Sequence, residues 1–198
     1  SQLSGKAPVL RSTKHWYLPL DRYQKEWLEK WIISHKDDWK VNVYGQCKSW
    51  LDQGLQPRAV TRDLDWGVPV PLPDSKGKVL YVWFDAPIGY ISATKALFAK
   101  RNDPKGWEKY WKQQDTKLVH FIGKDNILFH TVLWQGILLG MGNLGQPWDG
   151  DTPSPVFNLP YDVPANQYLN LGGQKFSKSL GVSLDVLDLT EKFGPDAV

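Results

Sequence analysis

The chain has 198 residues, of which 41% are apolar and 23% charged, and these proportions are typical of a globular, soluble protein. A formal net charge of +3 is too small to indicate nucleic-acid binding by charge alone. The single cysteine, Cys47, excludes an internal disulfide and any metal site built from several cysteines of this chain.

The first third of the chain is expected to be mainly helical. Apolar side chains recur at helical spacing between residues 21 and 33, and a second helical pattern runs from about 39 to 55. The polar start has no apolar signal core, and the single cysteine fits a protein of the reducing cytoplasm. The longest apolar run, residues 127–141, is interrupted by polar side chains and glycines, so no membrane span is expected.

From residue 79 onward the apolar pattern becomes that of alternating strands and helices. We expect buried strands at 79–84, 118–123 and 156–159, and helices at about 86–100 and 126–141. This series predicts an α/β fold with a parallel, doubly wound sheet and helices on both faces.

Sheets of this kind bind ligands beyond the carboxyl ends of their strands. Trp83 and Tyr90 lie at and after the end of the first expected strand, and His130 and Trp134 are four residues apart and therefore share a helix face. Together these rings could line a pocket for a soft, unbranched apolar side chain. The alternatives are ordinary core positions for the aromatic residues and a structural role for His130.

Gly123, Lys124 and Asp125 follow the second expected strand. Because Gly123 has no side chain, a flat ring could approach the backbone there. The carboxylate of Asp125 could accept hydrogen bonds from ribose hydroxyls, and a helix N-cap is its alternative role.

Residues 175–179 read Lys-Phe-Ser-Lys-Ser, and glycines flank this segment. Two ammonium groups and two hydroxyl groups on a short loop can close over a polyphosphate, because lysines act as point charges on phosphate oxygens. A solvated basic turn is the alternative interpretation of this segment.

Three segments in this order resemble the motifs of methionyl-tRNA synthetases, which are class I aminoacyl-tRNA synthetases. They are Tyr-Val-Trp-Phe-Asp-Ala-Pro-Ile-Gly-Tyr at 81–90, His-Phe-Ile-Gly-Lys-Asp at 120–125 and Lys-Phe-Ser-Lys-Ser at 175–179. The resemblance runs from about Arg11 to the C-terminus and includes Arg-Asp-Leu-Asp-Trp-Gly at 62–67. The stretch Asp-Ala-Pro-Ile-Gly-Tyr is its most specific part, because it separates methionine enzymes from their leucine, isoleucine and valine relatives.

The resemblance implies a site and a reaction. The methionine pocket would be formed by Trp83, Ala86, Pro87, Tyr90, His130 and Trp134. ATP would be bound by Gly123, Asp125, Lys175, Ser177 and Lys178, with Lys175 and Lys178 as the catalytic residues. The methionine carboxylate would attack the α-phosphorus of ATP, taken with Mg²⁺, and the methionyl group would then pass from the adenylate to tRNA(Met).

The resemblance also implies a domain organisation. Residues 1–60 would be the tail of a connecting domain, residues 61–160 the second half of a Rossmann-like catalytic domain, and residues 161–198 the lysine loop and the start of a stem-contact domain. The family's His-Ile-Gly-His motif and zinc-binding cysteine knuckles are absent from this sequence. The structural zinc is therefore expected outside the chain, no metal ligand is assigned within it, and the isolated piece is expected to be inactive.

Two other functions remain open from the sequence. The chain could be a non-catalytic, synthetase-like module that binds RNA or protein, which the missing motif favours. It could also belong to a different class I synthetase, which the Asp85–Tyr90 segment disfavours.

Overall fold

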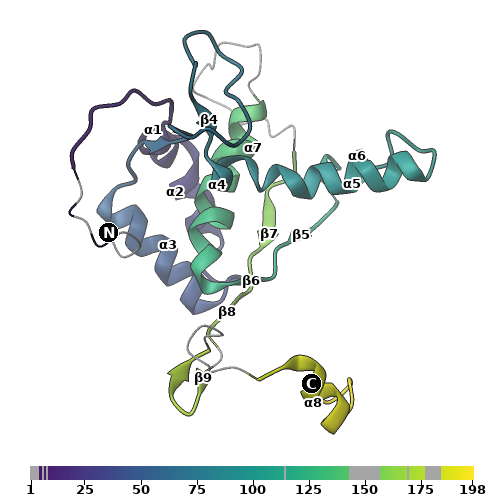
Figure 1. Cartoon of the computed structure of the whole chain (residues 1–198). Coiled ribbons are helices and arrows are strands. Elements are labelled where there is room, and N and C mark those ends of the chain that lie inside the picture. Colours follow the sequence, from purple (N-terminus) through teal and green to yellow (C-terminus); the bar gives the residue numbers. More distant parts are fainter. Residues whose placement is uncertain are drawn as a thin grey trace.

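The protein is described by a computed structural model that covers residues 5, 7, 9–113, 115–142, 157–168, 170–176 and 184–198, with the backbone alone at 142, 171, 174 and 175. Helices form most of the body, and the short strands pair two by two (Figure 1).

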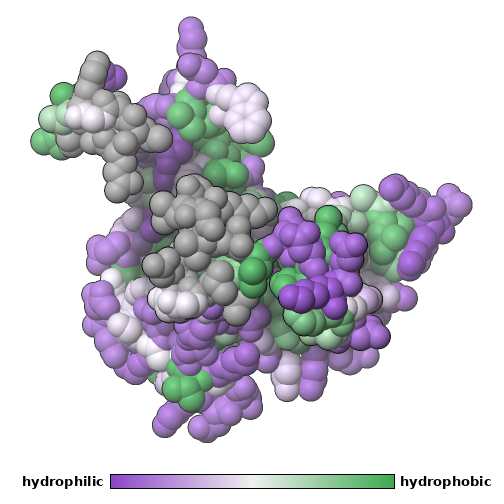
Figure 2. Space-filling view, turned by 60° about the horizontal axis from the view of Figure 1, so that its bottom comes forward, coloured by the Kyte–Doolittle hydropathy of each residue, from purple (hydrophilic) through white to green (hydrophobic). Residues whose placement is uncertain are grey.

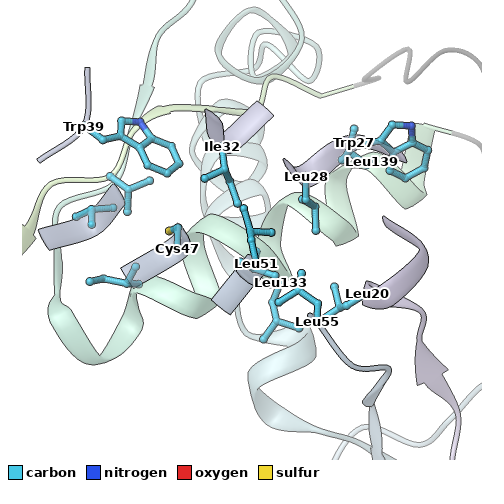
Figure 3. Packing of buried hydrophobic residues seen from close by; sticks show 14 of the residues in the cluster. Leu20, Trp27, Leu28, Ile32, Trp39, Cys47, Leu51, Leu55, Leu133 and Leu139 are labelled. Carbon is cyan, nitrogen blue, oxygen red and sulfur yellow. The ribbon is translucent and has the colours of Figure 1, made fainter. Parts of the chain in front are cut away.

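The N-terminal helices follow the predicted pattern. Helical backbone runs from α1 (Leu20–Tyr23) through the π-helical turn η1 (Gln24–Leu28) to α2 (Glu29–Ser34), and α3 (Val41–Gln53) follows. Their apolar faces bury against the long helical segment formed by η3 (Phe129–Leu133) and α7 (Trp134–Gly142). The main core lies between these elements, as Figure 3 shows for Ile32, Leu51 and Leu133.

Buried Cys47 ties α3 to η3 within this core. Its thiol donates to Oγ1 of Thr131 at 3.2 Å, and the Thr131 hydroxyl donates in turn to the carbonyl of Ile127 at 2.7 Å. Burial raises the pKa of the Cys47 thiol to about 11. The thiol therefore stays protonated at neutral pH and acts as a small packing group.

Two extended segments, residues 118–123 and 160–166, run parallel to each other. Strand β5 (Leu118–Val119) pairs with β7 (Pro160–Asp162), and β6 (Ile122–Gly123) pairs with β8 (Ala165–Asn166), both in parallel. Backbone bonds from His120 to Asp162 and from Ile122 to Pro164 connect the two pairs. The parallel arrangement is confirmed. The strand predicted at 118–123 is present as the two short strands β5 and β6, and it is not buried throughout, since Phe121 between them is 80% exposed. The third strand was predicted at 156–159, but residues 157–159 are not in a strand and residue 156 lies outside the described residues; β7 and β8 follow instead.

The predicted buried strand at 79–84 is wrong. Within this run only β4 (Val79–Leu80) forms a strand, and it pairs antiparallel with β3 (Thr61–Arg62). Near the N-terminus, β1 (Tyr17–Leu18) pairs antiparallel with β2 (Arg58–Ala59). The chain then turns into a short helix, α4 (Val82–Asp85), in which the Phe84 amide donates to the Tyr81 carbonyl at 2.7 Å. Val82 is 61% exposed, so this apolar run does not belong to a strand covered on both faces.

The predicted helix at 86–100 is confirmed as α5 (Ile88–Lys100), which extends from the body together with α6 (Glu108–Trp111) (Figure 1). A second apolar cluster joins this arm to α7 through Ile91, Trp111, Trp134 and Leu138.

The C-terminal part begins with a hairpin of β9 (Asn170–Leu171) and β10 (Gln174–Lys175). Its two-residue turn has positive φ at Gly172 (56°) and Gly173 (79°), a conformation that favours glycine at both positions. Helix α8 (Val186–Phe193) follows, and the Asp185 side chain caps it by accepting from the Leu187 amide at 2.8 Å.

Apolar side chains remain on the surface, including Phe121, which is 80% exposed. The face seen in Figure 2 accordingly shows hydrophobic patches among hydrophilic ones. In the part of the chain that the structure describes, no helix combines the length and apolarity needed to cross a membrane.

Candidate functional site

Four side chains from separate elements form one cluster, which we call the Tyr90 cluster. Tyr90 comes from α5, His120 from the link between β5 and β6, His130 from η3, and Trp134 from α7. The centre of the Tyr90 ring lies 4.9 Å from that of His120, 5.8 Å from that of His130 and 6.4 Å from that of Trp134. The structure thus brings together three of the predicted pocket residues and adds His120.

A hydrogen bond of 2.8 Å joins the Tyr90 hydroxyl to Nε2 of His130. Nδ1 of His130 lies 2.9 Å from the carbonyl oxygen of Asn126, which can only accept. We therefore assign the ring proton of neutral His130 to Nδ1, so that Nε2 accepts and the Tyr90 hydroxyl donates. The Asn126 carbonyl thereby fixes the direction of the Tyr90–His130 bond.

Both histidines of the cluster are held neutral at pH 7. Burial, and second the nearby His130, lower the pKa of His120 to about 4. Burial also lowers the pKa of His130, although its hydrogen bond to the Asn126 backbone opposes that shift. The cluster therefore offers an uncharged, aromatic environment with one oriented hydroxyl.

The other three predicted pocket residues lie in α4 and at its junction with α5. Trp83, in α4, stacks on Phe129 with ring centres 4.9 Å apart, so it contacts the residue next to His130. Ala86, exposed, follows α4, and Pro87, buried, precedes the first turn of α5 three residues before Tyr90. Trp83 thus reaches the helix that carries His130, but through a neighbouring side chain.

The second predicted group lies at the end of β6. A Cβ atom at Gly123 would meet no other atom within 4 Å, so open space lies beside this backbone. Asp125 belongs to the single turn η2 (Lys124–Asn126), whose N-cap is Gly123, so the N-cap alternative for Asp125 is wrong. The Asp125 carboxylate instead accepts a hydrogen bond from the Tyr168 hydroxyl, and the Lys124 ammonium lies 4.1 Å from the centre of the Tyr168 ring.

Asp125 also lines a cavity of about 380 Å³ between η2 and α3. The other residues around it are Asn42, Gln46, Trp50, Lys124, Ile127 and Gln167. An exposed carboxylate with a hydroxyl partner beside open space can exchange that partner for another hydroxyl group, such as one of a sugar.

The lysine loop is only partly described. The backbone of Lys175 forms the last residue of β10, and Ser177 and Lys178 lie outside the described residues. The roles expected for these three residues remain predictions.

Two residues of this region were not predicted as members of a site. His120 was treated as part of a buried strand, and no pattern in the sequence singled out Tyr168. The only signal for His120 was its place just before the Gly-Lys-Asp segment at 123–125.

Comparisons with known proteins agree with these observations. The model of the family described as tRNA synthetases class I (M) matches residues 1–198. The methionine–tRNA ligase of Cytophaga hutchinsonii is 54% identical over an alignment of 199 positions, which covers 98% of this chain and 27% of that protein. That of Parabacteroides distasonis is 56% identical over 179 residues, or 90% of this chain and 24% of that protein.

Among solved structures, Mycobacterium tuberculosis methionyl-tRNA synthetase in complex with methionyl-adenylate is similar, with a TM-score of 0.70 and 26% identity over 97% of this chain and 34% of that one. This likeness and the parallel strand pairs confirm the predicted α/β class with a partial Rossmann-like sheet. The chain spans about a quarter of the length of the curated relatives it matches. On the match over its whole sequence, the chain belongs to the class I (M) family of tRNA synthetases.

Proposed function

We propose that this chain is the methionine- and ATP-binding part of a methionine–tRNA ligase, here called the parent ligase. The reaction joins the methionine carboxylate to the α-phosphorus of ATP, taken as its magnesium complex, and releases pyrophosphate. The ribose hydroxyl of the terminal adenosine of tRNA(Met) then takes the methionyl group and releases AMP. Such chemistry depends on positioning and charge neutralisation more than on a protein nucleophile.

The observation that carries this proposal is the hydrogen bond between Tyr90 and His130 inside an uncharged aromatic cluster. A thioether packs favourably against aromatic ring edges, and the cluster offers it aromatic rings with no charged side chain among them. We assign Trp83, Ala86 and Pro87, next to this cluster, to the remaining wall of the methionine pocket. The relative from M. tuberculosis was solved with methionyl-adenylate, the intermediate of the proposed reaction.

We assign the nucleotide to the end of β6. Gly123 would allow the adenosine to approach the backbone, and Asp125 would accept from the ribose hydroxyls in place of Tyr168. Lys175, Ser177 and Lys178 would close on the phosphates, with the two lysines neutralising charge that develops on the leaving pyrophosphate.

The domain division proposed from the sequence places residues 1–60 in a connecting domain, 61–160 in the catalytic fold and 161–198 in the loop and stem-contact region. We place the family's structural zinc outside this chain and the reaction in the cytoplasm, where tRNA charging supports protein synthesis.

Binding measured by isothermal titration of the parent ligase tests the proposal. Methionine should bind and leucine should not, which separates this ligase from other class I synthetases. Asp125→Ala should weaken ATP binding and leave methionine binding within about twofold of wild type. A parent protein that binds RNA but neither methionine nor ATP would identify a non-catalytic module and refute the proposal.

A further inference from the structure

His120 touches both partners of the hydrogen bond that carries the proposed methionine pocket. Its ring centre lies 4.9 Å from that of Tyr90 and 5.1 Å from that of His130. Only 6% of His120 is exposed, so it forms a wall behind these two rings and does not face solvent.

The backbone holds this wall in a fixed place. The His120 amide donates to the Asp162 carbonyl at 3.0 Å, in line with the parallel pairs β5–β7 and β6–β8. Tyr90 and His130 are carried instead by α5 and η3. A ring mounted on the strand ladder can therefore set the position of a ring that arrives on a helix.

The contacts of His120 are those of a flat ring and not those of a hydrogen-bonding group. Nε2 of His120 is buried and has no hydrogen-bond partner among the residues that the structure describes. A buried polar atom without a partner is unfavourable, so hydrogen bonding by Nε2 does not explain a histidine at this position. What remains is the contact of its ring with those of Tyr90 and His130, which it meets at interplanar angles of 44° and 58°.

We propose that His120 is a positioning residue of the methionine pocket, which holds the Tyr90 ring so that its hydroxyl stays directed at His130. This inference rests on the proposed function. The role requires an uncharged ring at position 120. Tyr90 and His130 are the titratable groups in ring contact with it, and a proton on His120 would repel one on His130.

The test compares His120→Ala with His120→Phe in the parent ligase, using ATP–pyrophosphate exchange. His120→Ala removes the ring and should raise KM for methionine about 3- to 10-fold while KM for ATP stays within about twofold. His120→Phe keeps a flat, uncharged ring and should restore most of the methionine affinity. If the alanine variant does not fold, His120→Gln, which keeps volume without a ring, takes its place.

A double variant distinguishes action through Tyr90 from general support of the fold. The double variant Tyr90→Phe/His120→Ala should have a methionine KM no higher than that of the more impaired single variant, because both changes disturb the same hydrogen bond. His35→Ala is the matched control. His35 also packs against two aromatic rings, those of Trp31 and Trp39, each with ring centres 4.8 Å away, but it lies at the end of α2. That variant should leave KM for methionine unchanged.

Three outcomes would overturn the inference. They are an unchanged methionine KM in a folded His120→Ala enzyme, equal rises in both KM values, and a His120→Phe enzyme as impaired as the alanine variant. If instead the wild-type parent protein shows no methionine-dependent exchange, the proposed function itself fails, so the two failures are distinguishable.

Discussion

The Tyr90 hydroxyl lies 2.8 Å from Nε2 of His130, and this bond joins α5 to η3 across forty positions of sequence. Since Nδ1 of His130 donates to the Asn126 carbonyl, the bond has a defined direction, from Tyr90 to His130. One wall of the cluster is thereby fixed by two side chains, and burial lowers the pKa of the histidine.

Removing the Tyr90 hydroxyl should weaken methionine binding alone. Tyr90→Phe leaves Nε2 of His130 without its donor, and we expect KM for methionine to rise about fivefold with KM for ATP unchanged. ATP–pyrophosphate exchange, measured at a series of methionine concentrations, gives these KM values. Tyr110→Phe, which removes the hydroxyl of an exposed tyrosine in α6, is the control and should behave as wild type. Equal kinetics for both variants would contradict the role of Tyr90.

Stability should fall as the pH is lowered from about 6.5 toward 4. Burial lowers the pKa of His120 to about 4 and also lowers that of His130, so in this window the unfolded chain binds protons that the folded chain does not. The free energy of unfolding is therefore highest above pH 6.5, where both histidines are neutral in the folded and unfolded chain, and it decreases as the pH falls through this window. Urea unfolding at pH 7 and pH 5 measures the loss. His120→Phe should reduce the number of protons bound on unfolding by about one. An unchanged pH dependence of the free energy of unfolding in this variant would contradict the prediction.

The charge of Asp125 should matter for ATP and not for methionine. Asp125→Asn keeps the size of the side chain but removes the charged acceptor, and we expect KM for ATP to rise roughly 10- to 100-fold. Tyr168→Phe is the control, because it removes the partner seen in this structure and keeps the carboxylate. That control should leave KM for ATP within about threefold. An unaltered KM for ATP in Asp125→Asn would remove this residue from the nucleotide site.

Loss of the Lys178 charge should slow adenylate formation. We expect Lys178→Ala in the parent ligase to lower the rate roughly 10²- to 10³-fold with little change in methionine affinity, the scale for removing one preorganised charge at a transition state. Single-turnover formation of methionyl-adenylate measures the rate. Lys192→Ala, in α8, removes a lysine outside the proposed site and should react at the wild-type rate. A wild-type rate of adenylate formation in Lys178→Ala would contradict this role and favour the alternative that residues 175–179 are a solvated basic turn.

The helices were predictable because their apolar residues recur at a helical period, as in α3 and α5. The run at 79–84 was not, because a continuous apolar stretch does not distinguish a buried strand from a short helix. Here Tyr81 is extended and the next residues close a helical turn, which leaves Val82 and Trp83 largely exposed.

The site was predictable where a residue's type and place in a motif suggested a role, as for Tyr90 and Asp125. His120 begins the motif at 120–125, but neither its role nor that of Tyr168 was predicted, because both depend on contacts between segments distant in sequence. His120 meets Tyr90 only through the placement of α5 beside the parallel strands, and Tyr168 meets Asp125 across 43 positions. No local period or spacing encodes either contact.

The central claim, that the Tyr90 cluster binds methionine for activation by ATP, is tested most directly by ATP–pyrophosphate exchange in the parent ligase with each of the twenty amino acids. We predict that methionine alone supports exchange at low concentration, that Tyr90→Phe raises the methionine concentration needed, and that the isolated 198-residue chain shows none. Exchange driven equally by leucine or valine, or a methionine response unaffected by Tyr90→Phe, would contradict the account.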